Sequence, residues 1–116
     1  MLKFINVPLM LLTSTALYAQ TLPQNINDVD LQRLAYLEQG ETKYNRQCVA
    51  CHGTKANGGL GPSLLEKNED YLSDRLRTYR AGQTAGERSA MMWGQAASLT
   101  DRDIQELVKY IVSLNL

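Results

Sequence analysis

The run Cys48-Val49-Ala50-Cys51-His52 is the stretch of this sequence that decides its fold and its chemistry. Two thiols stand three residues apart, and an imidazole directly follows the second thiol. The chain of 116 residues contains no other cysteine and no other histidine. This C-x-x-C-H pattern is typical of covalent c-type haem attachment, because thiols at this spacing can each bond one vinyl group on one side of the macrocycle. We therefore expect thioether bonds at Cys48 and Cys51, with His52 as the proximal iron ligand.

Three other uses of a cysteine pair fit the surrounding sequence less well. A thioredoxin-like redox motif needs a βαβ context, and no segment here alternates with the period of two that indicates a strand. A disulfide between residues three apart would close only a short ring and would constrain nothing remote. A structural zinc site takes four protein ligands as a rule, which is more than two cysteines and one histidine can supply.

The first 19 residues have the features of an export signal. Lys3 gives a positive start, residues 4–18 are mainly apolar, and Ala16 and Ala19 fit a cleavage site loosely. We expect cleavage after Ala19 and a periplasmic mature protein with no stable membrane insertion. The alternative is an uncleaved membrane anchor, which is disfavoured because polar residues and a proline interrupt a run already shorter than the roughly 20 apolar residues of a membrane span.

Composition and charge describe a small globular domain. The formal charge of the full chain is zero, and removal of residues 1–19 takes away only Lys3 among the charged side chains, which leaves about −1. No basic stripe is present, so nucleic acid is a poor candidate for a partner. A domain of this size buries a low fraction of its surface, and a large apolar cofactor would supply part of the missing burial.

Apolar periodicity predicts an all-α chain with long loops. A helical pattern begins at Asp28 and continues towards Cys48, with an interruption at Gly40 that leaves open whether one helix or two form there. The glycines of residues 53–65 predict a loop with tight turns or a close approach of the backbone. A further helix follows between a plausible N-cap at Asn68 and a stop at Gly82.

The last helix is the clearest in the sequence. Thr100 and Asp103 have the spacing of a capping box, and a continuous apolar stripe follows them. The stripe consists of Ile104, Leu107, Val108, Ile111 and Val112. Residues 82–94, which precede this helix, show no regular pattern, and we expect an irregular segment there.

Several of these features together resemble a class I monohaem cytochrome c, most closely the small bacterial members of that class. They are the C-x-x-C-H motif, the Gly58-Gly59-Leu60-Gly61-Pro62-Ser63-Leu64 loop, and Met92 ahead of Leu99-Thr100-Asp101. The resemblance covers residues 39–116 and implies a cytochrome c fold, with three to four helices and long loops around one covalently bound haem. Residues 20–38 have no counterpart in the family pattern, and we expect them to form an N-terminal extension.

The resemblance also implies the remaining haem-binding residues. The methionine ligand of similar cytochromes lies on a loop, seven residues before the leucine that precedes the last helix, and here that leucine is Leu99. The implied sixth ligand is therefore Met92, with the adjacent Met91 as the alternative. The carbonyl of Pro62 is expected to accept a hydrogen bond from the second ring nitrogen of His52.

The resemblance also implies positions for several other residues. Gly40 and Tyr44 resemble a small-then-aromatic pair at a crossing of the first and last helices, facing Leu107 and Tyr110. The expected haem wall consists of Tyr71, Leu72, Leu76 and Tyr79, each of which could equally be plain core. The role of Trp93 stays open, and so does that of the basic side chains Arg75, Arg77, Arg80 and Arg88.

The function implied by the resemblance is electron transfer by a soluble exported carrier that meets redox protein partners, as a monomer or as a subunit of a complex. With histidine and methionine on the iron no open coordination position remains, so no catalytic residues are expected. One alternative is a cytochrome c subunit held in a periplasmic oxidoreductase complex. Another is a gas sensor or peroxidase-like protein with an open sixth site.

Overall fold

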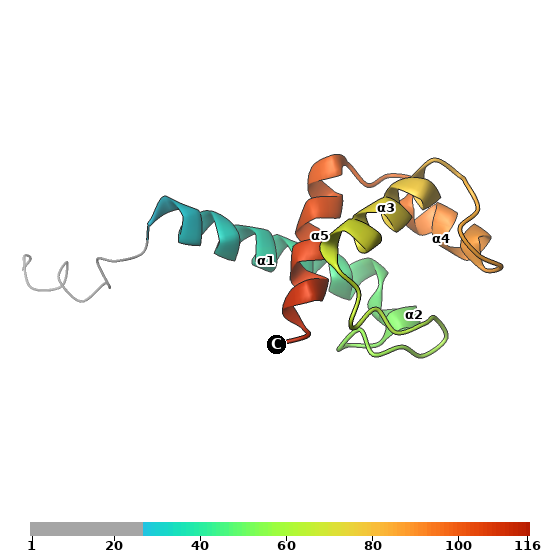
Figure 1. The fold of residues 1–116 in the computed structure, drawn as a ribbon, viewed down its shortest axis with the longest axis horizontal. Coiled ribbons are helices and arrows are strands. Elements are labelled where there is room, and N and C mark those ends of the chain that lie inside the picture. Colours follow the sequence, from blue (N-terminus) through green and yellow to red (C-terminus); the bar gives the residue numbers. More distant parts are fainter. Residues whose placement is uncertain (1–26) are drawn as a thin grey trace, which may run out of the picture.

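The computed structural model describes residues 27–116. The predicted signal peptide (residues 1–19) and the first part of the predicted N-terminal extension lie outside these residues. The helices are α1 (Asp28–Gln47), α2 (Val49–His52), α3 (Glu69–Arg80), α4 (Ser89–Ala96) and α5 (Asp101–Ser113), arranged as in Figure 1. Residues 27–116 contain no strand, and the all-α prediction is confirmed. Two short helices, α2 and α4, come in addition to the helices that the sequence predicted.

Hydrogen-bonded caps begin the three long helices. The side chain of Asn68 accepts a hydrogen bond from the backbone N–H of Tyr71, 2.8 Å away, as its predicted N-cap role requires. At the start of α5, Thr100 and Asp103 form the predicted capping box, with each side chain bonded to the other residue's backbone N–H. Asn27 caps α1 in the same way as Asn68 caps α3.

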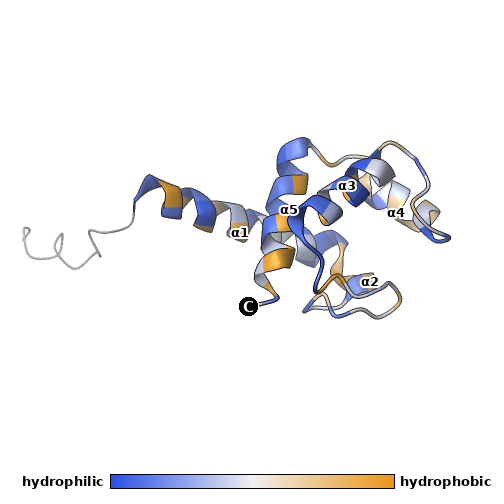
Figure 2. Cartoon of the chain, in the orientation of Figure 1, coloured by the Kyte–Doolittle hydropathy of each residue, from blue (hydrophilic) through white to orange (hydrophobic). Residues whose placement is uncertain are grey.

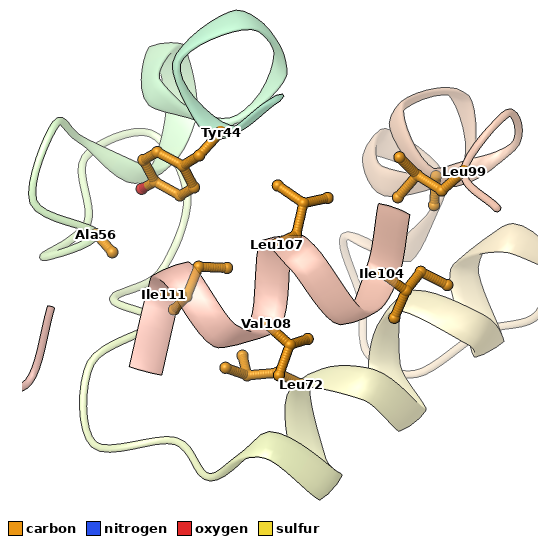
Figure 3. Packing of buried hydrophobic residues seen from close by; sticks show 9 residues of the cluster. Tyr44, Ala56, Leu72, Leu99, Ile104, Leu107, Val108 and Ile111 are labelled. Atoms are coloured by element: carbon orange, nitrogen blue, oxygen red, sulfur yellow. The ribbon is translucent and has the colours of Figure 1, made fainter. Parts of the chain in front are cut away.

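Helix α5 forms the centre of the core and lies between α1 and α3. Four of the five residues of its predicted apolar stripe are buried, with Ile104, Leu107, Val108 and Ile111 each at most 3% exposed, and Val112 is partly buried. In Figure 3, Val108 packs against Leu72 of α3, while Leu107 lies on the side that faces α1. The period of 3.6 residues gathers these side chains into one broad apolar stripe, of which α1 covers one side and α3 covers the other.

Helices α1 and α5 cross at Gly40, where their backbones come into close contact. A Cβ atom added to Gly40 would lie 2.0 Å from the backbone oxygen of Glu106 and 2.7 Å from Cβ of Tyr110. One turn further along α1, Tyr44 is fully buried and its ring lies 5.5 Å from that of Tyr110. The crossing predicted for Gly40 and Tyr44 is therefore present. It holds the start of the C-x-x-C-H motif against α5.

The question whether one helix or two precede the motif is settled, because α1 runs unbroken from Asp28 to Gln47, through position 38. Its first turns extend away from the other helices, as Figure 1 shows, and Figure 2 colours them mainly hydrophilic with some hydrophobic positions. The apolar side chains Val29, Leu31 and Leu34 in these turns are more than half exposed. No helix within residues 27–116 combines the length and the apolar character needed to cross a bilayer.

The prediction of an irregular segment over residues 82–94 is wrong in its second half, because α4 begins at Ser89. The glycine at position 94 suggested a break. A helix tolerates an interior glycine at a cost of about 1 kcal/mol relative to alanine, and the neighbouring Ala, Met and Gln residues are good helix formers. Met91 and Met92 accordingly lie on a helix, and the expectation that they occupy an irregular loop is corrected.

Candidate functional site

The C-x-x-C-H residues are arranged around a single helical turn. Cys48 caps the end of α1, with its N–H donating to the Tyr44 carbonyl, and the carbonyl of Cys48 accepts from the N–H of His52 at 2.9 Å. Cys51 lies one turn after Cys48, which brings both half-buried side chains to the same part of the surface. The two thiols are not joined in a disulfide. The imidazole of His52 is buried.

The glycine-rich loop folds back over this turn. The N–H of Gly58 donates to the carbonyl of His52, and the N–H of Gly61 donates to the carbonyl of Cys51, both at 2.8 Å. A Cβ atom at Gly61 would lie only 2.9 Å from Cε1 of His52. Glycine is needed at this position because the backbone packs directly against the imidazole ring.

Pro62 determines which nitrogen of His52 can bind a metal. Nδ1 of His52 lies 2.8 Å from the carbonyl oxygen of Pro62. A carbonyl oxygen can only accept a hydrogen bond, so Nδ1 carries a proton, and in the neutral imidazole the lone pair is then on Nε2. A neutral imidazole fixed in this tautomer is the form that ligates iron, and the second hydrogen bond also sets the orientation of the ring.

Two adjoining cavities open beside His52, with volumes of about 340 and 670 Å³. Both lie in the size range of binding sites for small molecules and cofactors. His52, Cys48 and Met92 line both cavities, whereas Cys51 lines only the smaller one. The rest of the shared wall is mainly apolar and includes Leu60, Leu76 and Leu107. An apolar space bordered by two thiols, an imidazole and a thioether fits a covalently attached haem.

Helix α4 brings the methionine pair to this space. Met91 is 65% exposed and lines only the smaller cavity, whereas Met92 is partly buried and lines both. Successive residues on a helix point about 100° apart, which explains why adjacent methionines differ so much in burial. Met92 is thus the methionine that is more enclosed with His52.

The four residues named as a possible haem wall lie on one helix and border the same cavity. Tyr71, Leu72, Leu76 and Tyr79 of α3 all line the larger cavity. Trp93, whose role the sequence left open, donates its indole N–H to the carbonyl of Gln83 at 2.9 Å and thereby ties α4 to the preceding loop.

The four arginines that the sequence grouped together separate into two kinds. Arg75 lines only the larger cavity, Arg88 lines both cavities, and Arg77 lines neither. Arg80 instead forms an ion pair with Asp101 and a hydrogen bond to the carbonyl of Leu99, which fastens α3 to the start of α5. Only the first pair can therefore contribute charge to the candidate site.

Some lining residues were not predicted. Leu60 borders both cavities from the tip of the glycine-rich loop, and Lys67 borders the larger one just before α3. Leu60 could have been identified from the sequence, because it is the one large apolar residue between glycines in this loop. Its side chain is therefore the one that can contribute to an apolar cavity.

Ser89 is buried and its hydroxyl joins two backbone groups of the turn before α4, accepting from the N–H of Ala85 and donating to the carbonyl of Gly86.

The electrostatic surroundings disfavour a redox-active thiol pair. Burial, together with the neighbouring Cys51, raises the pKa of the Cys48 thiol to about 11. Reactive cysteines have lowered pKa values, because the thiolate is the nucleophile. The zinc alternative finds no support either, since residues 27–116 contain no cluster of three or more His, Cys, Asp or Glu side chains that could hold a metal ion.

Comparison with known proteins identifies the family. Residues 35–111 match the protein family described as "Cytochrome C oxidase, cbb3-type, subunit III". The chain belongs to this family of c-type cytochromes. The resemblance to a monohaem c-type cytochrome is thereby confirmed, together with the cytochrome c fold and haem c as the cofactor.

Similar proteins include both small cytochromes and a larger one. This c-type cytochrome is 38% identical over 76 residues to cytochrome c-554(548) of Halomonas halodenitrificans, which covers 64% of this chain and 90% of that protein. It is 33% identical over 84 residues to cytochrome c-554(547) of Halothiobacillus neapolitanus, with 65% and 92% covered. It is also 30% identical over 87 residues to the Cbb3-type cytochrome c oxidase subunit CcoP of Azospirillum brasilense, with 69% of this chain and 29% of that protein covered.

Proposed function

We propose that this c-type cytochrome carries single electrons between redox proteins through one haem c. The observation that carries the proposal is the buried His52, fixed by the Pro62 carbonyl and facing a mainly apolar cavity that Met92 also lines. When bound, haem c supplies an iron that alternates between the ferric and ferrous states.

The residues of the chain hold and tune the cofactor. Cys48 and Cys51 would fix it by thioether bonds, and His52 would supply Nε2 as the proximal ligand. The thioether of Met92 would complete the ligand set, which raises the reduction potential and leaves no coordination position for a substrate. The apolar lining would exclude water and favour the reduced state, in which the iron–porphyrin centre has lost its positive charge.

Met92 is preferred to Met91 on two grounds. It lies seven residues before Leu99, as the family pattern requires, and it is the methionine that lines both cavities. Met91, which is largely exposed, is the natural control, because it has the same side chain on the same helix.

The test is an absorption spectrum of three exported proteins: wild type, Met92→Ala and Met91→Ala. We expect all three to hold covalent haem. The oxidised wild type and Met91→Ala should keep the sulfur-to-iron charge-transfer band towards the red end of the spectrum, and Met92→Ala should lose it and bind carbon monoxide when reduced. Retention of the band in Met92→Ala would contradict the ligand assignment. Binding of carbon monoxide by the native reduced wild type would favour the open-site alternative.

A second candidate function is that of a cytochrome subunit in a periplasmic oxidoreductase complex. It is favoured by the family description and by the similarity to an oxidase subunit. The exposed apolar side chains at the start of α1, such as Val29 and Leu34, would then contact a partner subunit. Native size measurement on protein purified from its own cell distinguishes a free carrier from a bound subunit.

The remaining parts of the proposal concern processing. We propose that residues 1–19 are a signal peptide removed after export to the periplasm, that residues 20–38 are an N-terminal extension, and that residues 39–116 are the cytochrome domain. Mass spectrometry of the mature protein tests the cleavage site, and a mature N-terminus at residue 20 is the expected result.

A further inference from the structure

Three basic side chains line the larger cavity without a carboxylate partner. Lys67, Arg75 and Arg88 all line the larger cavity. None of the three forms an ion pair with a carboxylate among residues 27–116, whereas four other basic side chains of this part of the chain do. Those four are Lys43, Arg80, Arg102 and Lys109. Arg88 also lines the smaller cavity, so Lys67 and Arg75 are the two cations that only the larger cavity contains.

Arg75 is the most firmly held of the three. Its side chain on α3 is partly buried, its guanidinium lies 5.0 Å from the centre of the Tyr71 ring, and one of its nitrogens donates to the carbonyl of Ala85 at 3.3 Å. An arginine has five N–H donors, so most of them stay available. Among residues 27–116 no carboxylate pairs with this cation, so its free donors can bind an anion inside the cavity.

The position of Arg75 relative to the cysteines indicates which anion this is. The smaller cavity includes both Cys48 and Cys51, whereas the larger one leaves out Cys51 and extends to α3 and the loop before α4. A haem macrocycle carries its two vinyl groups on one side and its two carboxylate groups on the other. If the vinyl side is bonded to the cysteines, the carboxylates belong at the end of the space that Arg75 borders.

We propose that Arg75 binds a carboxylate of the haem and, through this charge, raises the reduction potential of the iron, with Lys67 and Arg88 adding to the field. This inference rests on the proposed function. A planar guanidinium with parallel N–H donors matches a carboxylate in a bidentate geometry, which lysine cannot reproduce. Arg88 is placed less favourably, because it is exposed and already donates to the carbonyl of Leu60.

The charge balance of this end of the cavity predicts a particular pH dependence. The cations outnumber the one acidic side chain, so the haem carboxylate stays ionised through the neutral range and the wild-type potential stays constant there. Without Arg75, the carboxylate takes up a proton at higher pH, and the potential falls as the pH rises. Besides Cys48 and His52, the charged and titratable groups that line the larger cavity are Lys67, Arg75, Arg88, Glu87, Tyr71 and Tyr79.

The experiment is potentiometry of purified holoprotein at a series of pH values. Arg75→Gln should lower the equilibrium constant for reduction several-fold, up to about tenfold (59 mV for a one-electron couple), and should introduce the pH dependence. Arg75→Lys should preserve much of the potential, since it keeps the charge. The matched control is Arg77→Gln on the same helix, which should behave as wild type because Arg77 lines neither cavity.

Two results would overturn the inference. One is an Arg75→Gln potential that matches those of wild type and Arg77→Gln at every pH. The other, which needs no variant, is a wild-type potential that already falls through the neutral range. Failure of the proposed function is separate and would be seen earlier, as a wild-type protein without covalent haem or without a reversible one-electron couple.

Discussion

Replacement of Gly40 by alanine tests the packing that positions the haem motif. The added Cβ would lie 2.0 Å from the backbone oxygen of Glu106, about 1.5 Å short of an ordinary non-bonded contact. A backbone oxygen inside a helix cannot rotate away, so α1 and α5 must separate. Their separation loosens the contact of Tyr44 with Tyr110, which lies directly beside the crossing.

The expected magnitude follows from two opposing effects. Overpacking of a well-packed interior costs about 1–3 kcal/mol, and the rigid backbone contact at Gly40 places this case at the upper end. Alanine is a better helix former than glycine by about 1 kcal/mol, which offsets part of the loss. We therefore expect a net loss of about 2 kcal/mol in the free energy of unfolding, or a fall in Tm of about 10 °C for a domain of this size.

The assay is urea unfolding of the holoprotein, with the midpoint and the slope compared between variants. Gly94→Ala on α4 is the matched control, because a Cβ added there meets no atom within 4 Å. That variant should gain up to about 1 kcal/mol from helix propensity alone. A Gly40→Ala protein as stable as wild type, or a Gly94→Ala protein destabilised to the same extent as Gly40→Ala, would refute the reasoning.

Two further predictions concern the packing of Gly61 against His52 and the dependence of stability on pH in acid. Gly61→Ala places a Cβ 2.9 Å from the ring of His52, so the yield of covalent haem should fall and the potential of the remaining holoprotein should shift; wild-type values for both would exclude a close packing role. Burial raises the pKa of Glu106, but the hydrogen bonds from Lys43 and Arg102 lower it by more. The pKa of Glu106 therefore lies below its usual value of 4.5. Glu106 therefore stabilises the fold above about pH 4.5, and this contribution disappears as the pH falls through its lowered pKa. Glu106→Gln should be less stable than wild type at neutral pH by an amount that shrinks in acid, and a difference in urea midpoint that is independent of pH would contradict this.

Local sequence patterns predicted those features whose interactions are themselves local. The caps at Asn68 and Thr100 depend on atoms three residues away, and both are present in the structure. The apolar stripe of α5 follows from helical periodicity alone. Helix α4 was missed because its glycine suggested a break and its short sequence carries no capping signal, as its N-cap Arg88 makes no side-chain capping bond.

Long-range contacts were beyond the reach of such patterns. Glu106 precedes Leu107 in the sequence, and a charged residue of this kind is expected on the solvated face of a helix. In the structure, however, Glu106 is only 2% exposed. Lys43, 63 residues earlier in the chain, pairs with it across the α1–α5 crossing. No periodicity within either helix indicates this pair, because it depends on how the two helices pack.

The sequence by itself determined that Cys48, Cys51 and His52 form a haem attachment motif. All three groups lie within about one helical turn, so their spacing in the sequence determines their relative positions. Only the tertiary structure decided what surrounds this motif. It placed Met92 rather than Met91 between the two cavities and brought Arg75 to the end away from Cys51. Those positions depend on the rotation of α4 and α3 about their axes, which is fixed by packing against α5 and not by any residue's immediate neighbours.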